Sequence, residues 1–432
     1  MLQKLRLMRT HVGRMRVQRE LVTKTYPLLR PFAVRHRSLL GARTRIVAVT
    51  GSLGKTTATA AIAAVLGRPD SLYASNVQGM AALAVLGNWP WHRYRAIEVG
   101  IAKPGQMADF AALIRPDVVV QTAVAMDHAR TLGTLEQIRD EKARLLDGLR
   151  PGGVAVLNGD DPMVRTMAAR TGARIVTYGH EAGNDVRALD WRLDWPNGNV
   201  VTVAAGDEVL TIRSRLLGRA YTYPILAAVA VGRLEGIPTP RIVAALEAVP
   251  PQTCRLEPIR LPDGVTLIDD TYKGNAKTVH AALDLLAMVP ARRVAVLGEV
   301  YFEIPAQRDE AYHAIGARLP AAADRVILFG KDVGTIRDSA VAAGMAPDAI
   351  VEVGLEVTAA MAEARRIVRP GDVVLLKGKQ SQHLSRVGLA LEGREVRCTI
   401  PACEVLGVHC RSCPMLGRGW QGLAVPTSQS AP

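Results

Sequence analysis

Aromatic residues and cysteines are scarce in this 432-residue sequence, and long uninterrupted apolar runs are missing. With 4 Phe, 5 Trp and 9 Tyr, the chain has few stacking platforms for a single-stranded nucleic acid. No segment reaches the roughly 18 uncharged apolar residues that a membrane-spanning helix needs. Four of the five cysteines follow residue 397, which excludes a disulfide framework for the rest of the chain. Val, Leu, Ile and Ala must therefore fill the core, as is typical of α/β proteins with buried parallel strands.

The positive charge is concentrated at the start of the chain. The formal net charge is +14, and residues 1–45 hold twelve Lys or Arg against one acid, Glu20. The remainder is nearly balanced, so we predict no nucleic-acid partner. Apolar residues recur among these arginines at loose helical spacing, which fits a solvated surface helix. It also fits a helix that docks on an anionic membrane surface or an acidic partner protein.

The same segment bears on localisation. Its Arg-rich, acid-poor composition is shared by mitochondrial targeting segments, but no apolar stretch is long enough for a secretory signal. We predict a cytoplasmic protein, with attachment at the membrane periphery as the alternative.

Beyond residue 45, short apolar strands alternate with helical stretches, which predicts an α/β fold with mostly parallel sheets. Strands are expected at 46–50, 96–99, 118–122, 154–158 and 174–178, and in a second series at 266–269, 293–298, 325–329 and 372–377. Two runs in residues 186–213, at 186–193 and 200–212, alternate apolar and polar side chains and flank Pro196-Asn197-Gly198, which indicates an antiparallel segment. Pro250 and Pro251 suit a domain boundary, because paired prolines cannot continue a helix. We predict a basic leader (1–45), a P-loop central domain (46–252), a Rossmann-like C-terminal domain (253–397) and a cysteine-containing tail (398–432).

A phosphate-binding loop is predicted between the first of these strands and the helix after it. Glycines let the backbone wrap closely around a phosphate, and a helix N-terminus offers free N–H groups and positive dipole. Lys55 can reach the β- and γ-phosphates, and the Thr56 hydroxyl can hold Mg²⁺. The loop is shorter than the common P-loop, whose first glycine would fall at Val49. We predict that ATP and Mg²⁺ bind Gly51, Ser52, Gly54, Lys55, Thr56 and Thr57.

The segment 50–57 resembles the loop of the Mur ligase family, and later segments fit that family in order over about residues 45–395. The nearest branch adds D-alanyl-D-alanine to a UDP-N-acetylmuramoyl-tripeptide. The resemblance implies an ATP-dependent ligase that joins a carboxylate to an amine through an acyl-phosphate, releasing ADP and phosphate. That branch also has an N-terminal domain for the UDP-sugar, whereas about 45 basic residues precede the loop here. We therefore expect no such domain, so a nucleotide-sugar substrate has no support in this chain unless a separate subunit supplies that domain.

The resemblance implies catalytic and metal-binding residues in the central domain. Glu98, at the end of a strand, matches a magnesium ligand, and His128 matches the metal-site histidine. Lys142 fits the lysine that the family carbamylates, which would turn a cation into a second magnesium ligand. Lys55, His128 and Lys142 are the implied catalytic residues, and Asn76 matches a substrate-binding position.

Further implied residues lie in the C-terminal domain. Arg255 and Asp270 are expected to bind nucleotide, and Tyr272, Asn275, Lys377 and Ser381 are expected near substrate. Two positions depart from the family pattern. Ala123 stands where the family usually has Asn, and residues 218–224 replace the His-Asn motif that frames adenine, so Tyr221 or Tyr223 is expected to stack on the base.

The cysteines at the C-terminal end are spaced C-x4-C-x6-C-x2-C. Four thiolates can hold a structural zinc ion tetrahedrally, so Cys398, Cys403, Cys410 and Cys413 are candidate zinc ligands. Redox chemistry and ordinary reduced thiols are the other interpretations.

Three other functions fit parts of this pattern. A small-molecule kinase would use the same loop without Lys142 or the second domain. A membrane-associated amino-acid polymer ligase would use the basic leader. A nucleotide-binding scaffold with degraded catalysis would account for the departures at Ala123 and residues 218–224.

Overall fold

The computed structural model describes residues 11–69, 77–403 and 409–419, and for residues 11–16 and Arg19 the backbone only. The predicted substrate residue Asn76 lies outside the described residues. The chain divides into two compact units at Pro250 and Pro251, one of them comprising Val17–Pro250 and the other containing Pro251–Pro432. None of the described helices is long and apolar enough to cross a bilayer.

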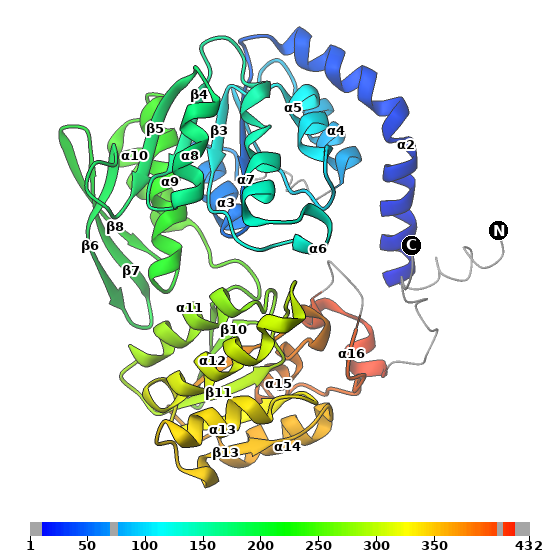
Figure 1. The fold of residues 1–432 in the computed structure, drawn as a ribbon, viewed down its shortest axis with the longest axis vertical. Coiled ribbons are helices and arrows are strands. Elements are labelled where there is room, and N and C mark those ends of the chain that lie inside the picture. Colours follow the sequence, from blue (N-terminus) through cyan, green and yellow to red (C-terminus); the bar gives the residue numbers. More distant parts are fainter. Residues whose placement is uncertain (1–10, 70–76, 404–408, 420–432) are drawn as a thin grey trace, which may run out of the picture. The chain divides into compact units, whose positions relative to one another are not determined.

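The unit 17–250 is built on an eight-stranded sheet in the order β2-β1-β3-β4-β5-β6-β7-β8 (Figure 1). Its strands are β1 (Arg45–Thr50), β2 (Tyr94–Glu98), β3 (Val118–Gln121), β4 (Val154–Asn158), β5 (Arg174–Gly179), β6 (Val186–Asp194), β7 (Gly198–Ala205) and β8 (Glu208–Ser214). Pairing is parallel from β2 through β6, which confirms the predicted mostly parallel α/β fold. Because these strands run in parallel, the chain leaves β1, β2 and β3 at the same edge of the sheet.

Two hydrophobic layers cover the two faces of this sheet. Val47 and Val49 point into one cluster with α3 (Lys55–Val65), α9 (Thr222–Leu234) and α10 (Thr239–Ala248). Ile46 and Ala48 point into the other with α4 (Gln78–Leu86), α5 (Gln106–Ile114), α7 (Leu135–Ala143) and α8 (Pro162–Thr166). A short helix, α6 (Ala129–Leu132), precedes α7. The alternation along β1 follows from the two-residue repeat of a strand.

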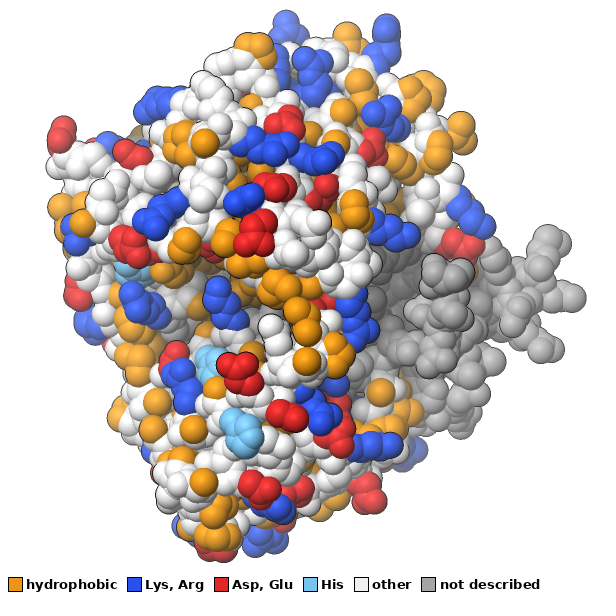
Figure 2. Space-filling view, viewed as in Figure 1, with side chains coloured by type: hydrophobic (Ala, Val, Ile, Leu, Met, Phe, Trp, Pro, Cys, Tyr) orange, Lys and Arg blue, Asp and Glu red, His pale blue; other side chains and the backbone are white. Residues whose placement is uncertain are grey.

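The helix α2 (His11–Leu40) packs on this unit through one face from Val22 onward. Arg37 is 2% exposed and donates to the carbonyl oxygens of Ile114 and Arg115 and to the Asp117 carboxylate at 2.7 Å. The opposite face carries exposed apolar and basic side chains. Figure 2 shows hydrophobic side chains beside Lys and Arg along the upper right edge, where α2 runs in Figure 1.

The predicted antiparallel segment is present, but with three strands rather than two. Antiparallel pairs join β6 to β7 and β7 to β8. The expected single run at 200–212 is broken by a turn at Gly206 and Asp207, where Gly206 has a φ of 64°. The Gly206-Asp207 dipeptide between two alternating runs is typical of a two-residue hairpin, so the sequence does carry a signal for this turn.

The unit 251–432 contains a six-stranded sheet in the order β13-β12-β11-β14-β10-β9. The strands are β9 (Glu257–Arg260), β10 (Thr266–Asp270), β11 (Arg293–Gly298), β12 (Arg325–Phe329), β13 (Ile350–Glu352) and β14 (Val373–Lys377). The helices are α11 (Ala276–Ala287), α12 (Arg308–Ala322), α13 (Gly334–Ala342), α14 (Val357–Ile367), α15 (Ser385–Leu391) and α16 (Met415–Arg418). All pairs are parallel except β9 with β10. The two edge strands β9 and β13 were not expected, because β13 has three residues and β9 contains Pro258 and two charged residues.

Candidate active site

The predicted phosphate loop joins β1 to α3 at the edge where β1, β2 and β3 end. Gly54 is the N-cap of α3 with a φ of 81°, and the first turn of α3 carries no acidic residue. The Lys55 Nζ donates to the Gly51 carbonyl oxygen at 2.7 Å, so its ammonium lies over the loop. Gly51 has a φ of 145°, and a Cβ there would collide with Thr122 Oγ1. A helix N-terminus and a nearby cation fit a bound phosphate.

Residues 122–125, which follow β3, hold this loop from the side. Ser52 donates its N–H to the Ala123 carbonyl oxygen at 2.6 Å. The Ser52 hydroxyl donates to the Ala125 carbonyl oxygen and accepts from the Ala125 N–H, at 3.1 and 3.0 Å. Thr122 donates its hydroxyl to the Leu53 carbonyl oxygen at 2.6 Å. Ser52 thus directs both its N–H and its hydroxyl to the neighbouring segment.

Lys142 lies beneath the phosphate loop. It is 1% exposed, and its Nζ donates to the Gly51 carbonyl oxygen at 3.2 Å. A capping box at Thr134 and Gln137 starts α7, and the buried Glu141 accepts from the Met107 N–H at 3.0 Å. These contacts fix the end of α7 against the core, so the structure brings Lys142 and the phosphate loop together.

Glu98 and His128 reach the same sheet edge by different elements. Glu98 ends β2 opposite Val49, directly before the loop. His128 follows the segment that holds Ser52 and caps α6 with a φ of 64°. Its Nε2 lies 3.9 Å from the Asp127 carboxylate, and both residues are half-buried. Carboxylate, imidazole and hydroxyl donors at one edge are a suitable set for Mg²⁺ near phosphate, with oxygen ligands dominant.

The predicted residues of the other unit gather where β10 and β14 end side by side. Asp270 pairs in register with Lys377, and the Lys377 Nζ lies 2.5 Å from the Asp270 carboxylate. Both side chains are buried, and burial raises the pKa of Asp270 and lowers that of Lys377. The Lys377 Nζ also donates to the Lys273 carbonyl oxygen at 2.6 Å. This ion pair ties the loop after β10 to the end of β14.

Arg255 and Tyr272 stack on each other beside this pair. The Arg255 guanidinium lies 4.1 Å from the centre of the Tyr272 ring, as in a cation–π contact. Cys254 and Leu256 have φ values of 58° and 47°.

Asn275 accepts from the Thr278 N–H at 3.0 Å, which makes its side chain the N-cap of α11.

The backbone brings the last predicted substrate residue to the same place. A Cβ on Gly274 would meet the Gly378 backbone, so the loops after β10 and β14 touch. Ser381 follows this contact in the short helix Gln380–Gln382, and its carbonyl oxygen accepts from the Cys403 N–H at 2.6 Å. Residues 273–275 and 377–381 are therefore neighbours.

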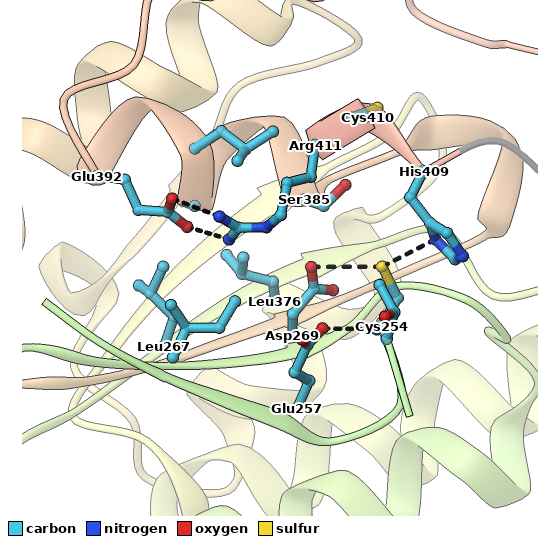
Figure 3. A pocket seen from close by; sticks show the side chains of 14 residues that line it. Cys254, Glu257, Leu267, Asp269, Leu376, Ser385, Glu392, His409, Cys410 and Arg411 are labelled. Carbon is cyan, nitrogen blue, oxygen red and sulfur yellow. Dashed lines mark hydrogen bonds and ion pairs between the residues drawn. The ribbon is translucent and has the colours of Figure 1, made fainter. Parts of the chain in front are cut away.

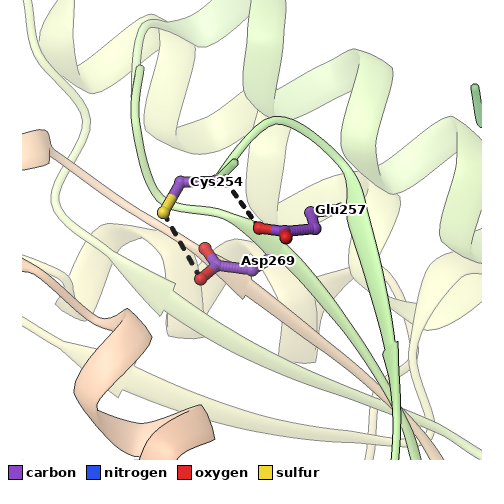
Figure 4. A group of neighbouring side chains, drawn as sticks. All are labelled: Cys254, Glu257 and Asp269. Atoms are coloured by element: carbon purple, nitrogen blue, oxygen red, sulfur yellow. Dashed lines mark hydrogen bonds between the residues drawn. The ribbon is translucent and has the colours of Figure 1, made fainter. Parts of the chain in front are cut away.

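A pocket opens on another side of this sheet, around Cys254, Asp269 and His409 (Figure 3). Cys254, Glu257 and Asp269 present ligand atoms within 4.8 Å of one another (Figure 4). Hydrogen bonds explain this grouping, because Glu257 accepts from the Cys254 N–H at 3.0 Å and Asp269 accepts from its thiol at 3.5 Å. Burial raises the pKa of Asp269 to about 6 and also raises the pKa of the Cys254 thiol.

Three of the four candidate zinc ligands, Cys398, Cys410 and Cys413, lie close enough for the charges of Cys413 and Cys398 to add to burial in raising the pKa of the Cys410 thiol, but they are not within ligand distance of one another as a group. Among the described residues, the group of three or more potential ligands within 4.8 Å includes none of them. Cys398 is buried, with its Sγ 3.8 Å from an Arg386 nitrogen, and the other three are half-buried. Burial raises the pKa of the Cys410 thiol to about 12, which favours the protonated form.

Tyr223 belongs to a polar cluster in the unit 17–250. Its hydroxyl donates to the Asp160 carboxylate at 3.0 Å, and its ring lies 5.1 Å from the His180 ring. Burial and the Asp160 charge raise the pKa of Tyr223. Tyr221 precedes α9 and packs partly against the core. Adenine stacking by either tyrosine stays a prediction.

Two domain families match the chain, the Mur ligase middle domain over residues 49–232 and the Mur ligase glutamate ligase domain over residues 254–380. The chain belongs to the Mur ligase family. Mur ligases are ATP-dependent enzymes that form C–N bonds, so the predicted enzyme class is confirmed and the alternatives are not favoured.

Several relatives of this Mur ligase share one name. The UDP-N-acetylmuramoyl-tripeptide–D-alanyl-D-alanine ligase of Mycobacterium bovis is 31% identical over 374 residues, covering 80% of this chain and 72% of the relative. The enzyme of that name from Escherichia coli is 28% identical over 357 residues, covering 81% and 77%. MurF from Acinetobacter baumannii has the same fold, with a TM-score of 0.74 at 21% identity over 86% of this chain and 81% of that one.

Sequence reasoning missed the residues that support the loop of this Mur ligase. Asn158 donates to the Thr122 carbonyl oxygen at 2.7 Å, and Asp161 accepts from the Val124 N–H at 2.9 Å. Gln121 donates to the Lys142 carbonyl oxygen at 3.1 Å. Gln121 and Asn158 are polar residues that end apolar strands, and this signal could have identified them.

Proposed function

We propose that this Mur ligase activates a small-molecule carboxylate as an acyl-phosphate and joins it to the amine of a short D-amino-acid peptide. The observation that carries the proposal is the buried Lys142, held 3.2 Å from a carbonyl oxygen of the phosphate loop. Burying a lysine ammonium costs free energy unless neighbouring groups stabilise its charge, so a buried lysine at this position indicates a role. A phosphate loop alone would serve a kinase equally well.

The geometry of the loop itself suits ATP. Gly54 opens the start of α3, and Lys55 lies over the loop. In the proposed first step, a carboxylate oxygen of the substrate attacks the γ-phosphorus of ATP and ADP leaves. Lys55 neutralises charge on the transferred phosphoryl group. The Ser52 contacts to residues 123–125 keep the loop in one conformation during this step.

We propose Mg²⁺ at Thr56 and Glu98, and a second Mg²⁺ at His128 and carbamylated Lys142. Bound magnesium would offset the negative charge of the phosphates. A carbamate nitrogen retains one N–H, so Lys142 could keep its bond to Gly51 while presenting a carboxylate. An unmodified ammonium beside magnesium would be repelled.

The amine would then attack the acyl carbon, phosphate would leave, and the nitrogen would lose a proton. D-alanyl-D-alanine is named for the relatives, which supports a D-amino-acid peptide as the amine. Tyr272, Lys377 and Ser381 are the proposed residues of the amine site. Asn275 supports it through the cap of α11, and Arg255 and Asp270 are proposed on the nucleotide side. Zinc at the four cysteines also stays a prediction.

The test measures ADP release by the full-length protein with MgATP and a small-molecule extract as the carboxylate source. We expect D-alanyl-D-alanine, but not L-alanyl-L-alanine, to stimulate release, and hydroxylamine to trap a hydroxamate. Lys142→Ala should reduce turnover by at least a hundredfold, while the exposed Lys24→Ala should not. Removing bicarbonate should lower wild-type turnover, and adding it should restore the rate.

Each result decides one part of the proposal. A stable phosphate ester in place of a hydroxamate would indicate a kinase. Hydroxamate formation with no preference between the two dipeptides would leave the acyl-phosphate and overturn the amine. Full turnover in Lys142→Ala would refute the role of that lysine.

A further inference from the structure

The outer face of α2 carries a line of exposed apolar side chains. Leu21, Leu28, Phe32 and Leu39 are 60, 70, 67 and 71% exposed. At 3.6 residues per turn, these positions fall within about 20° of one line along the helix, over roughly 27 Å. Burial of large apolar side chains is favourable, so four of them in one exposed line indicate a surface that binds something apolar.

The helix cannot turn this line toward the protein, because its other face is anchored. Tyr26 and Arg30 bind the Asp109 carboxylate, at 2.5 and 2.9 Å. Arg37 is buried among the backbone carbonyl oxygens after α5. The apolar line therefore stays on the outside of the folded unit.

A pair of exposed tryptophans continues this surface beyond the helix. The His36 Nε2 lies 2.6 Å from the Asn88 carbonyl oxygen. This contact joins α2 to the turn that follows Asn88. In that turn, Trp89 and Trp91 are 54 and 72% exposed, and their rings stack with centres 5.2 Å apart. Tryptophan is the side chain enriched where protein meets the boundary between lipid and water.

The charge of the neighbouring residues indicates which kind of partner binds this apolar surface. Arg35 is exposed within about 60° of the apolar line, as is Lys24, which pairs with Glu20 at 2.9 Å. Arg43 and Arg93 are exposed beside the helix end and the tryptophans. Residues 1–45 hold twelve basic residues and one acid, and the acids that pair with Arg30, Arg37 and Arg45 offset only part of this charge, so a second copy would be repelled. We propose that Leu21, Leu28, Phe32, Leu39, Trp89 and Trp91 form a docking surface for an anionic phospholipid bilayer. This inference is independent of the proposed substrates.

The full-length protein should sediment with vesicles of phosphatidylglycerol and phosphatidylcholine, and much less with phosphatidylcholine alone. Raising the salt concentration should weaken binding, because salt screens the attraction to the lipid headgroups. The double variant Leu28→Ser/Phe32→Ser should bind at least tenfold more weakly, a change that equals about 1.4 kcal/mol. It keeps every basic residue, so it separates the apolar line from charge alone.

Leu189→Ser/Val209→Ser is the matched control, since these side chains are 47 and 64% exposed elsewhere in the same unit. It should bind vesicles as the wild type does. Tryptophan emission should shift to shorter wavelength on binding, and Trp89→Phe/Trp91→Phe should abolish that shift.

Equal binding by Leu28→Ser/Phe32→Ser and the wild type would overturn the proposal, as would equal binding to the two kinds of vesicle. Light scattering without vesicles tests whether the surface instead binds a second copy of the protein. A dimer that Leu28→Ser/Phe32→Ser dissociates would show that the surface contacts a second copy instead of lipid.

Discussion

Asp270 and Lys377 form a buried ion pair, and we propose that they contact nucleotide and amine, so variants of this pair can separate structural support from substrate binding. Lys377→Met would leave the Asp270 carboxylate without its cation in a position only 8% exposed. Breaking a buried ion pair from one side costs about 3–5 kcal/mol, because one charge stays buried alone. The loss should fall on the free energy of unfolding of the unit 251–432, since the pair joins β10 to β14.

Hydrogen–deuterium exchange measured by mass spectrometry can show which strands lose stability. Exchange of β10 and β14 peptides should accelerate in Lys377→Met, whereas exchange of β1 and β3 peptides should not. Asp270→Asn/Lys377→Met should regain about 2 kcal/mol or more relative to the sum of the single variants, because neither charge remains. Turnover should stay low in the double variant if Lys377 also holds substrate.

Additive effects of the two single variants would refute the reasoning. A coupling energy below about 0.5 kcal/mol would mean that solvent or other groups satisfy each charge separately. Wild-type turnover in Lys377→Met, by contrast, would show that the ion pair has a structural role alone. Lys377 would then no longer belong to the proposed amine site.

Two further changes test other parts of the structure. Gly51→Ala should reduce ATP binding at least tenfold, measured by calorimetry, because its Cβ would collide with Thr122 and its φ of 145° disfavours alanine; Gly172→Ala, at an open position, is the control, and unchanged ATP affinity in Gly51→Ala would contradict the loop geometry. Asp269 has a pKa of about 6 against its ordinary 3.8, so the folded state holds this proton more tightly and stability falls as pH rises from 4 to 6. The difference corresponds to about 3 kcal/mol, so Asp269→Asn should gain up to that much relative to wild type across this window, as followed by thermal unfolding. A difference between the two proteins that is constant with pH would show that Asp269 titrates normally.

Much of the fold could be predicted because buried parallel strands are short apolar runs with polar ends. The runs at 154–158 and 325–329 contain mostly Ala, Val, Ile, Leu or Phe and became β4 and β12 with the expected bounds. β13 is three residues long, and β9 contains Pro258 and two charged residues. Their place in the sheet depends on β12 and β10 beside them, which no local pattern reveals.

The residues of the candidate site likewise divide into those that the local sequence predicts and those that it does not. The position of the loop at residues 51–54 could be predicted from local spacing, because its glycines and Lys55 act through the backbone next to them, and its binding of phosphate stays a prediction. The contact between Lys142 and Gly51 joins residues 91 positions apart, and only the family resemblance pointed to it. The side-chain roles of Ser52 and Asn275 could not be predicted, because each also fits a ligand contact equally well in the sequence.

Arg37 has a consequence for anyone who wishes to shorten this protein. The match to the Mur ligase middle domain begins at residue 49, so a truncation just before β1 would keep every residue of that match. It would also remove Arg37 and expose the Asp117 carboxylate and two carbonyl oxygens that this arginine binds. Asp117 in turn accepts from the Ile46 N–H at 2.8 Å, at the beginning of β1. We therefore expect the chain to need α2 for stable folding, although α2 lies outside the segment that matches the family.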